Sequence, residues 1–257
     1  MGKSKRRLLI FFVWFAILSP VMTCCIHRPL TVNNNFSHHN FHHESTVKIK
    51  LWPEGGGPEE PVLTEDFIAG PSSGSGTVIK TNIFKNTSWV LTAAHVCLVT
   101  PDLFAVNPVS ENKDAINDLV WNLEVVTWAG DTIPAEVVAF DIALDACVIK
   151  VEDIWAKPLS IASSAPKIGD KVYGAHAPLG FSDKKMMPLF EGYFSGHHQM
   201  GAVYTLPVIA GSSGGSIVNS RNQVLAIVVY GIPEFPQMCI TTDFYELKEF
   251  LKSVDFD

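Results

Sequence analysis

Three residues of this chain have the side chains, and the neighbours in the sequence, that nucleophilic catalysis requires. His95 follows two small residues at the end of an apolar run, so its imidazole would face a cleft from a rigid wall, as a general base must. Ser213 lies in the segment GSSGGS at 211–216, where glycines permit a tight turn that exposes a hydroxyl. Asp145 directly precedes an apolar run and could accept the imidazole N–H. Together they predict acyl transfer, with Ser213 as nucleophile, His95 as base and Asp145 as the orienting acid.

The loop around Ser213 also predicts an oxyanion hole. Its glycines let successive backbone N–H groups point into one small volume, which can hold the negative oxygen of a tetrahedral intermediate. The expected donors are the amides of Gly211 and Ser213. A flexible Gly/Ser linker is the alternative, but apolar residues flank the loop at 208–210 and 217–218. We therefore expect a structured turn.

Asp141 competes with Asp145 for the role of the acid. It stands four residues earlier in the chain. A buried carboxylate is costly unless it is paired, and the apolar strand begins directly after Asp145. Asp145 is therefore preferred.

Short β-type runs must position these residues. Many short strands without long helices between them predict an all-β barrel or sandwich. The candidate strands are 46–51, 76–79, 89–91, 123–128, 135–140, 146–151, 171–174, 202–206 and 224–229. One helix is predicted near the end of the chain, with Asp243 as its N-cap and apolar residues at 244, 247, 250 and 251 on one face.

In the order His, Asp, Ser, these segments resemble the trypsin-like (chymotrypsin-fold) serine peptidases, and among them the HtrA/Deg-type protease domain. LTAAH at 91–95 and GSSGGS at 211–216 carry the resemblance, with support from SGSGTVI at 73–79, IPAEVVAFD at 133–141 and IGDKVY at 168–173. The resemblance covers about residues 45–257. It implies two six-stranded antiparallel β-barrels (chymotrypsin-like) with a C-terminal helix, and it places the family's acid on Asp145.

The resemblance implies a serine endopeptidase that acts on protein or peptide substrates through an acyl-enzyme, without a cofactor or a metal. Two alternatives stay open: a catalytically inactive binding module on the same fold, and an esterase, because it shares the acyl-enzyme chemistry. Ser212 stands where digestive-type members carry Asp, so activation by a newly formed N-terminal ammonium is not expected. We also expect no PDZ domain after the catalytic domain.

The pocket for the residue before the scissile bond (P1) is expected between two short walls. No acid stands in either wall, so a small or apolar P1 residue is expected rather than Lys or Arg, although Glu234 lies close in the chain. The walls are formed by Pro207, Val208, Ile209 and Ala210 on one side and by Val229, Tyr230 and Gly231 on the other.

Residues 1–26 predict export. Four basic residues precede an unbroken apolar run at 8–18, which Ser19 and Pro20 end. The segment is either a signal peptide or an uncleaved membrane anchor, and lipidation at Cys24 is a further alternative. The protein would be secreted, periplasmic or membrane-anchored, with its protease domain outside the cytoplasm. Residues 27–44, rich in Asn and His, read as a polar linker before the trypsin-like serine protease domain at 45–257.

The charge and the residue types of the chain limit the classes of partner that we expect. The net charge is −7, and removing the four basic residues of the leader leaves −11, which argues against a nucleic-acid partner. Histidines at 38–43 could bind a metal weakly, but a solvated linker is preferred. Cys97, Cys147 and Cys239 lie in the body of the chain and predict either one disulfide or buried thiols.

Overall fold

The computed structural model describes residues 41–54, 62–63, 68–69, 71–98 and 120–257. The predicted leader at 1–26 and most of the predicted linker lie outside these residues. Over the described ranges, none of the helices has the length and apolarity that a membrane crossing requires. In the same ranges, no cluster of three or more His, Cys, Asp or Glu side chains is placed to hold a metal ion.

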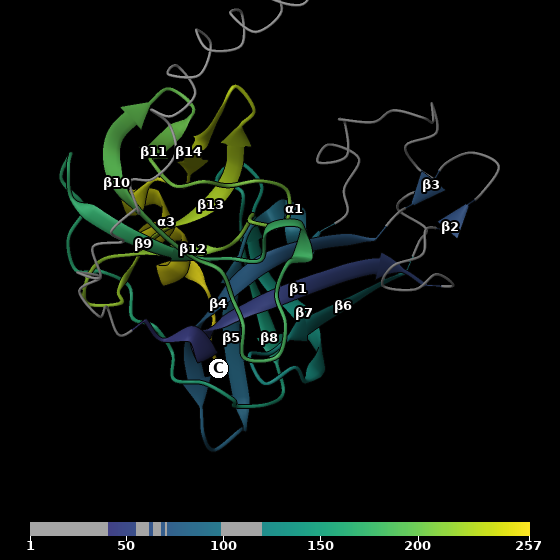
Figure 1. The fold of residues 1–257 in the computed structure, drawn as a ribbon. Coiled ribbons are helices and arrows are strands. Elements are labelled where there is room, and N and C mark those ends of the chain that lie inside the picture. The colour runs from purple at the N-terminus through teal and green to yellow at the C-terminus, as the bar shows by residue number, and fades with distance from the viewer. Residues whose placement is uncertain (1–40, 55–61, 64–67, 70, 99–119) are drawn as a thin grey trace, which may run out of the picture. The chain divides into compact units, whose positions relative to one another are not determined.

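Strands of the first half of the chain close into one antiparallel barrel, drawn in purple to teal in Figure 1. The strand order around the barrel is β1-β4-β5-β8-β7-β6. Alternation along β1 points Val47 and Ile49 into the barrel interior, where they meet Val90 and Ile149. The strands are β1 (Thr46–Pro53), β4 (Ser72–Asn82), β5 (Thr87–Thr92), β6 (Trp121–Val126), β7 (Thr132–Asp141) and β8 (Ala146–Val151). Two short strands, β2 (Val62–Leu63) and β3 (Ile68–Ala69), pair with each other outside this barrel.

The second half of the chain closes into another antiparallel barrel, drawn in green to yellow in Figure 1. Its order is β10-β11-β14-β13-β12-β9, and its interior holds Val172, Tyr204, Ile217 and Ala226. The strands are β9 (Lys171–Ala175), β10 (Leu189–His198), β11 (Gly201–Tyr204), β12 (Ser216–Val218), β13 (Val224–Ile232) and β14 (Phe235–Thr241).

A shared apolar cluster joins the two barrels and the C-terminal helix α3 (Phe244–Ser253). The cluster contains Trp89 from the first barrel, Ile227 from the second and Leu247 from the helix, all essentially inaccessible to solvent. Burial of side chains of this size contributes about 1.5–3 kcal/mol each. The cluster therefore holds the two barrels against each other.

The predicted fold class is confirmed: over the described ranges the protein is all-β, with two six-stranded antiparallel barrels and a C-terminal helix. The helix prediction is also confirmed, because the Asp243 side chain accepts hydrogen bonds from the amides of Tyr245 and Glu246. Strands β10, β12 and β14 were not predicted. β12 has only three residues, β10 contains two glycines, and β14 carries a proline, so all three have weak strand signals.

The folded unit begins before the predicted boundary at residue 45. Phe41 is buried in the cluster that joins the barrels, and the His43 ring stacks on Trp128 with centroids 5.2 Å apart. His43 opens the short 3₁₀ helix η1 (His43–Ser45). The last residues of the predicted linker therefore pack on the barrels, because an aromatic side chain there finds apolar surface to bury.

Candidate functional site

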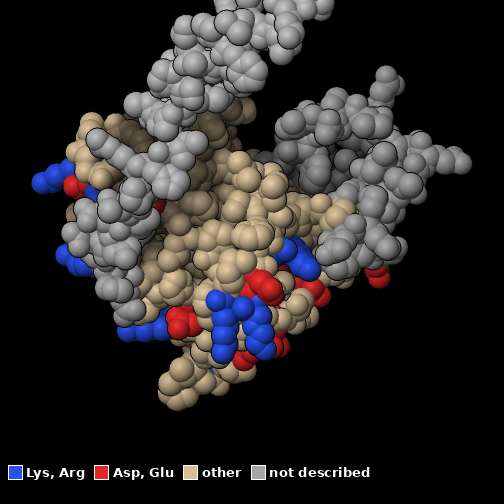
Figure 2. Space-filling view, viewed as in Figure 1, with Lys and Arg blue, Asp and Glu red and all other residues tan. Residues whose placement is uncertain are grey.

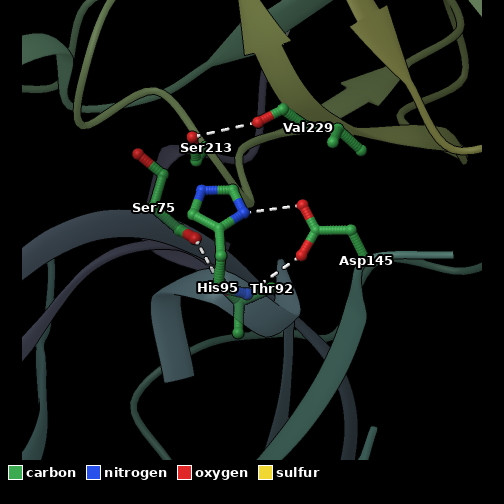
Figure 3. A network of polar contacts seen from close by, with 6 residues as sticks. All are labelled: Ser75, Thr92, His95, Asp145, Ser213 and Val229. Atoms are coloured by element: carbon green, nitrogen blue, oxygen red, sulfur yellow. Dashed lines mark hydrogen bonds and ion pairs between the residues drawn. The ribbon is translucent and has the colours of Figure 1, made fainter. Parts of the chain in front are cut away.

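The structure brings His95 and Asp145 into direct contact. His95 lies in the one-turn helix α1 (Ala94–Cys97) that follows β5, and its Nδ1 is 2.6 Å from Asp145 Oδ2. The His95 main-chain N–H also donates to Asp145 Oδ1 at 2.9 Å. One carboxylate thus holds both the ring and the backbone of the histidine, which fixes the ring orientation and leaves the other ring nitrogen, Nε2, facing away from the acid (Figure 3).

Asp145 reaches His95 from a tight turn between β7 and β8. Its φ of 55° lies in the left-handed region, which Asp tolerates better than most residues, and its side chain is only 13% exposed. Asp141 does something different: its Oδ1 accepts a hydrogen bond from the Leu144 amide at 3.0 Å and so caps the same turn. Of the two predicted rivals, Asp145 is the one that contacts the histidine.

A disulfide joins the two segments that carry this pair. Cys97 and Cys147 are bonded to each other, and each stands two residues after a member of the pair. Cys239 is a free and buried thiol. The disulfide therefore ties α1 to β8 directly beside the His95–Asp145 contact.

Ser213 lies in the turn before β12, on the side of the imidazole ring away from Asp145 (Figure 3). Among hydrogen bonds between described residues, its Oγ donates to the carbonyl of Val229 at 3.2 Å rather than to His95. Serine hydroxyls turn about one bond between staggered positions. The hydroxyl of the nucleophile expected from the sequence therefore occupies a rotamer that faces β13.

The turn at 211–216 leaves two backbone amides for a ligand. Within the part of the chain that the structure describes, no carbonyl accepts a hydrogen bond from the N–H of Gly211 or Ser213. The Ala210 carbonyl belongs to the same peptide unit as the Gly211 N–H, and it accepts a hydrogen bond from the Leu179 amide at 2.6 Å. Because the two groups of a trans peptide point in opposite directions, the Gly211 N–H faces away from Leu179. The neighbouring amides are all engaged, in bonds from Ser212 to Ile209, from Gly214 to Val228 and from Gly215 to Ser212. This arrangement is typical of an oxyanion hole.

Glycine is required at 211. Its φ is +87°, and a Cβ there would stand 2.6 Å from the Ala177 carbonyl oxygen. Any side chain would push this turn away from the neighbouring loop and so displace the two free amides.

Ser75 connects the first barrel to this turn, and Figure 3 shows its contact with Thr92. Its amide donates to the Ser213 carbonyl at 2.8 Å, and its hydroxyl donates to the Gly211 carbonyl at 2.8 Å. The same hydroxyl accepts from the Ala177 amide, and the Ser75 carbonyl accepts from the Thr92 hydroxyl, both at 2.8 Å. Ser75 lies in the SGSG segment at 73–76, but no local pattern there predicts a role for its hydroxyl. Only the pairing of distant segments reveals it.

A pocket of about 380 Å³ opens beside Ser213. Five of the seven residues expected in its walls line it, namely Val208, Ile209, Ala210, Tyr230 and Gly231. Pro207 and Val229 do not line it: Pro207 is exposed, and Val229 contributes its carbonyl to Ser213 instead. Four lining residues were missed from the sequence, namely Val228, Ile232, Pro233 and Pro236. Among the described residues no acid lines the pocket, and Glu234 stays outside it.

His176 is buried beneath the nucleophile turn. Its ring stacks on Phe190 with centroids 4.2 Å apart, and neither ring nitrogen has a hydrogen-bond partner among the described residues. Burial lowers the pKa of His176 from 6.5 to about 3. His197 and His198, in contrast, are exposed on β10.

His176 should make the protein sensitive to acid. The folded state keeps this ring neutral, whereas the unfolded chain protonates it near pH 6.5, so stability falls as the pH drops from about 6.5 toward 3. In wild type, protonation of His176 in the unfolded chain lowers the free energy of unfolding by up to about 1.4 kcal/mol per pH unit below pH 6.5. Replacing His176 with Leu should remove this dependence. Urea unfolding of wild type and variant between pH 4 and 7 measures the difference. A His198→Gln control should follow wild type, and parallel curves for all three proteins would contradict the prediction.

Comparison with known proteins agrees with this geometry. The family model described as "Trypsin-like peptidase domain" matches residues 74–227, and no curated protein matches the chain. The active form of the Rv3671c protease from M. tuberculosis is 19% identical in sequence, with a TM-score of 0.57 over 83% of this chain and 82% of that one. An inactive form of the same protease is 19% identical, with a TM-score of 0.53 over 83% of this chain and 90% of that one.

The solved structures show a shared fold. The family match goes further, because it spans more than half of this chain and includes the segments that carry His95, Asp145 and Ser213. The chain therefore belongs to the trypsin-like peptidase domain family.

Proposed function

We propose that this peptidase is a serine endopeptidase in which Ser213 is the nucleophile, His95 the general base and Asp145 the acid that orients it. One observation carries the proposal. Asp145 holds both the Nδ1 and the main-chain N–H of His95, while Ser213 lies at the opposite edge of the same ring (Figure 3).

The geometry supports the following sequence of steps. The Ser213 hydroxyl rotates from Val229 toward Nε2 of His95, loses its proton to that nitrogen and attacks the peptide carbonyl. The amides of Gly211 and Ser213 stabilise the oxyanion. His95 then protonates the leaving amine. In the second half of the reaction His95 takes a proton from water, the hydroxide attacks the acyl ester, and the proton returns to the Ser213 oxygen as the ester bond breaks and the carboxylic acid leaves.

The pocket beside Ser213 favours a small or apolar P1 residue. Its lining is dominated by aliphatic and proline side chains, and the Tyr230 ring is 36% exposed at its wall. A buried Lys or Arg head group would find no acidic partner among the described lining residues, and an unpaired buried charge is costly.

Labelling with a fluorophosphonate tests the proposal. Such reagents react with an activated serine hydroxyl, so we expect one adduct, mapped by peptide mass spectrometry to Ser213 and not to Ser212. Prior unfolding should abolish labelling, because activation depends on the folded site. An intact folded protein that is not labelled would favour the inactive binding module, for which the structure offers no separate support. An esterase would be labelled as well, so hydrolysis of casein separates the two enzymes.

We also propose that the chain is exported and acts outside the cytoplasm, secreted, in the periplasm or attached to a membrane through residues 1–26. The Cys97–Cys147 disulfide supports this, because such bonds persist in oxidising compartments. Recovery of the native protein from cytoplasm with both cysteines reduced would count against it.

A further inference from the structure

The turn at 211–216, which carries the two free amides, contains no charged residue. None of the ion pairs that the structure shows between described residues involves it. In Figure 2 the middle of the face drawn there is broadly uncharged, and the acidic and basic side chains gather toward its lower and left edges. The shape of the turn therefore depends on neutral hydrogen bonds and on packing.

The hydroxyl of Ser75 bonds two backbone groups that can each bond in only one sense. The Ala177 amide can only donate, and it stands 2.8 Å from Ser75 Oγ. The Gly211 carbonyl can only accept, and it stands 2.8 Å from the same oxygen. The hydroxyl therefore accepts from Ala177 and donates to Gly211. Ser75 is inaccessible to solvent, so bulk water does not compete for either bond.

The bonds of Ser75 hold the peptide group that follows each free amide. Its Oγ holds the Gly211 carbonyl, and its main-chain N–H holds the Ser213 carbonyl at 2.8 Å. A peptide group is planar, so a bonded carbonyl fixes the whole plane and limits the rotation of the residue before it. The N–H groups of Gly211 and Ser213 therefore keep one direction.

The backbone of Ser75 is itself held against the turn. Its carbonyl accepts from the Thr92 hydroxyl at 2.8 Å, and a Cβ on Gly214 would overlap both of these groups. The Ser75 hydroxyl thus acts on the turn from a fixed point of the first barrel.

We infer that the Ser75 hydroxyl is a positioning group for the oxyanion hole, because it holds the Gly211 carbonyl and so keeps the two free amides aimed at the developing oxyanion. The inference rests on the proposed function. Ser75 acts through Gly211 and Ser213 and not on the substrate itself. Donors aimed at charge that develops in the transition state lower the barrier without strengthening substrate binding. Loss of the hydroxyl should therefore lower kcat and leave KM nearly unchanged.

Ser75→Ala tests this inference. On an internally quenched peptide we expect kcat to fall about a hundredfold, the scale of a misplacement of about 1 Å at a catalytic site, with little change in KM. The same factor should appear at low and at high salt, because the lost bond involves no charge. Fluorophosphonate labelling to completion counts the competent sites, so kcat is expressed per labelled Ser213.

Thr77→Val is the matched control. Thr77 lies two residues later on β4 and is equally buried, and its hydroxyl donates to the Ser216 hydroxyl at 2.7 Å, so it also joins the first barrel to the second. Valine keeps the branched shape and removes that bond without touching the Gly211 carbonyl. We expect kcat per labelled site to stay near the wild-type value.

Ser75→Cys is the second variant, and it serves alone if Ser75→Ala does not fold. A thiol is a weaker donor and acceptor at the same place, so we expect kcat to fall about tenfold with KM again little changed. Equal falls of kcat per labelled site in the Ser75 variants and in Thr77→Val would indicate a general structural role and overturn the inference. Fewer labelled sites with a wild-type kcat at each of them would overturn it too.

The behaviour of wild type separates this inference from the proposed function. If wild type is labelled at Ser213 and cleaves the peptide, and the Ser75 variants match its kcat, the positioning role alone is rejected. If wild type is neither labelled nor active, the peptidase mechanism fails and the positioning role fails with it.

Discussion

Replacing Ser213 with alanine is expected to lower kcat on a peptide substrate by about a millionfold, the scale seen when a serine peptidase loses its nucleophile. The reason is chemical: the variant lacks the hydroxyl that would attack, and the other serine hydroxyl drawn in Figure 3, that of Ser75, is already bonded to Gly211 and Ala177. Casein cleavage and hydrolysis of a quenched peptide by purified Ser213→Ala measure the effect.

Ser212 provides the matched control. It is the adjacent serine, it is buried, and its Oγ accepts from the Ile209 amide at 3.3 Å. Ser212→Ala removes one neutral hydrogen bond, worth about 1 kcal/mol of stability, and should retain most of the activity. If activity survives in Ser213→Ala but disappears in Ser212→Ala, the nucleophile is Ser212 and the proposed mechanism is refuted.

The second large effect is expected at Asp145. Asp145→Asn keeps the shape of the side chain but places an amide N–H₂ opposite Nδ1 of His95, where the carboxylate now accepts at 2.6 Å. The ring would then carry its proton on Nε2 and could not accept one from Ser213. A loss of about ten-thousandfold in kcat follows from the wrong tautomer.

Asp141→Asn is the comparison for this variant. Asp141 caps the turn through a bond from the Leu144 amide, which an asparagine oxygen can also accept. We therefore expect nearly wild-type kcat for Asp141→Asn, measured on the same peptide over the same pH range. A similar collapse in both variants would mean that the turn, and not the tautomer, controls activity.

The three residues of the proposed triad could be picked out from the sequence because each stands at a local structural boundary. His95 follows β5, Asp145 precedes β8, and Ser213 occupies a glycine turn before β12, so strand ends and turns locate all three. The preference for Asp145 over Asp141 came from the same local reasoning. The P1 walls were predicted in part: Val208 to Ala210 directly precede the turn in the chain, and Tyr230 and Gly231 lie on β13, whose strand signal the sequence shows.

The remaining features depend on contacts between distant segments. The role of Ser75 depends on residues more than a hundred positions away, which no local pattern encodes. Pairing Cys97 with Cys147 required the register of β5 with β8, which sets Thr92 opposite Cys147. The rotamer of Ser213 depends on the Val229 carbonyl across the turn. Strand β12 is too short to show a period, so it became visible only through its pairing with β9 and β13.

The four hydrogen bonds of Ser75 have a consequence for how activity arises during folding. The turn with Gly211 and Ser213 belongs to the second barrel, yet its carbonyls are held by a first-barrel residue whose own carbonyl is fixed by Thr92, three positions before the histidine. A newly made chain with only one barrel complete would lack this support. The site can therefore hydrolyse a peptide only when both barrels are folded and packed together. A half-folded chain would not cleave the proteins around it.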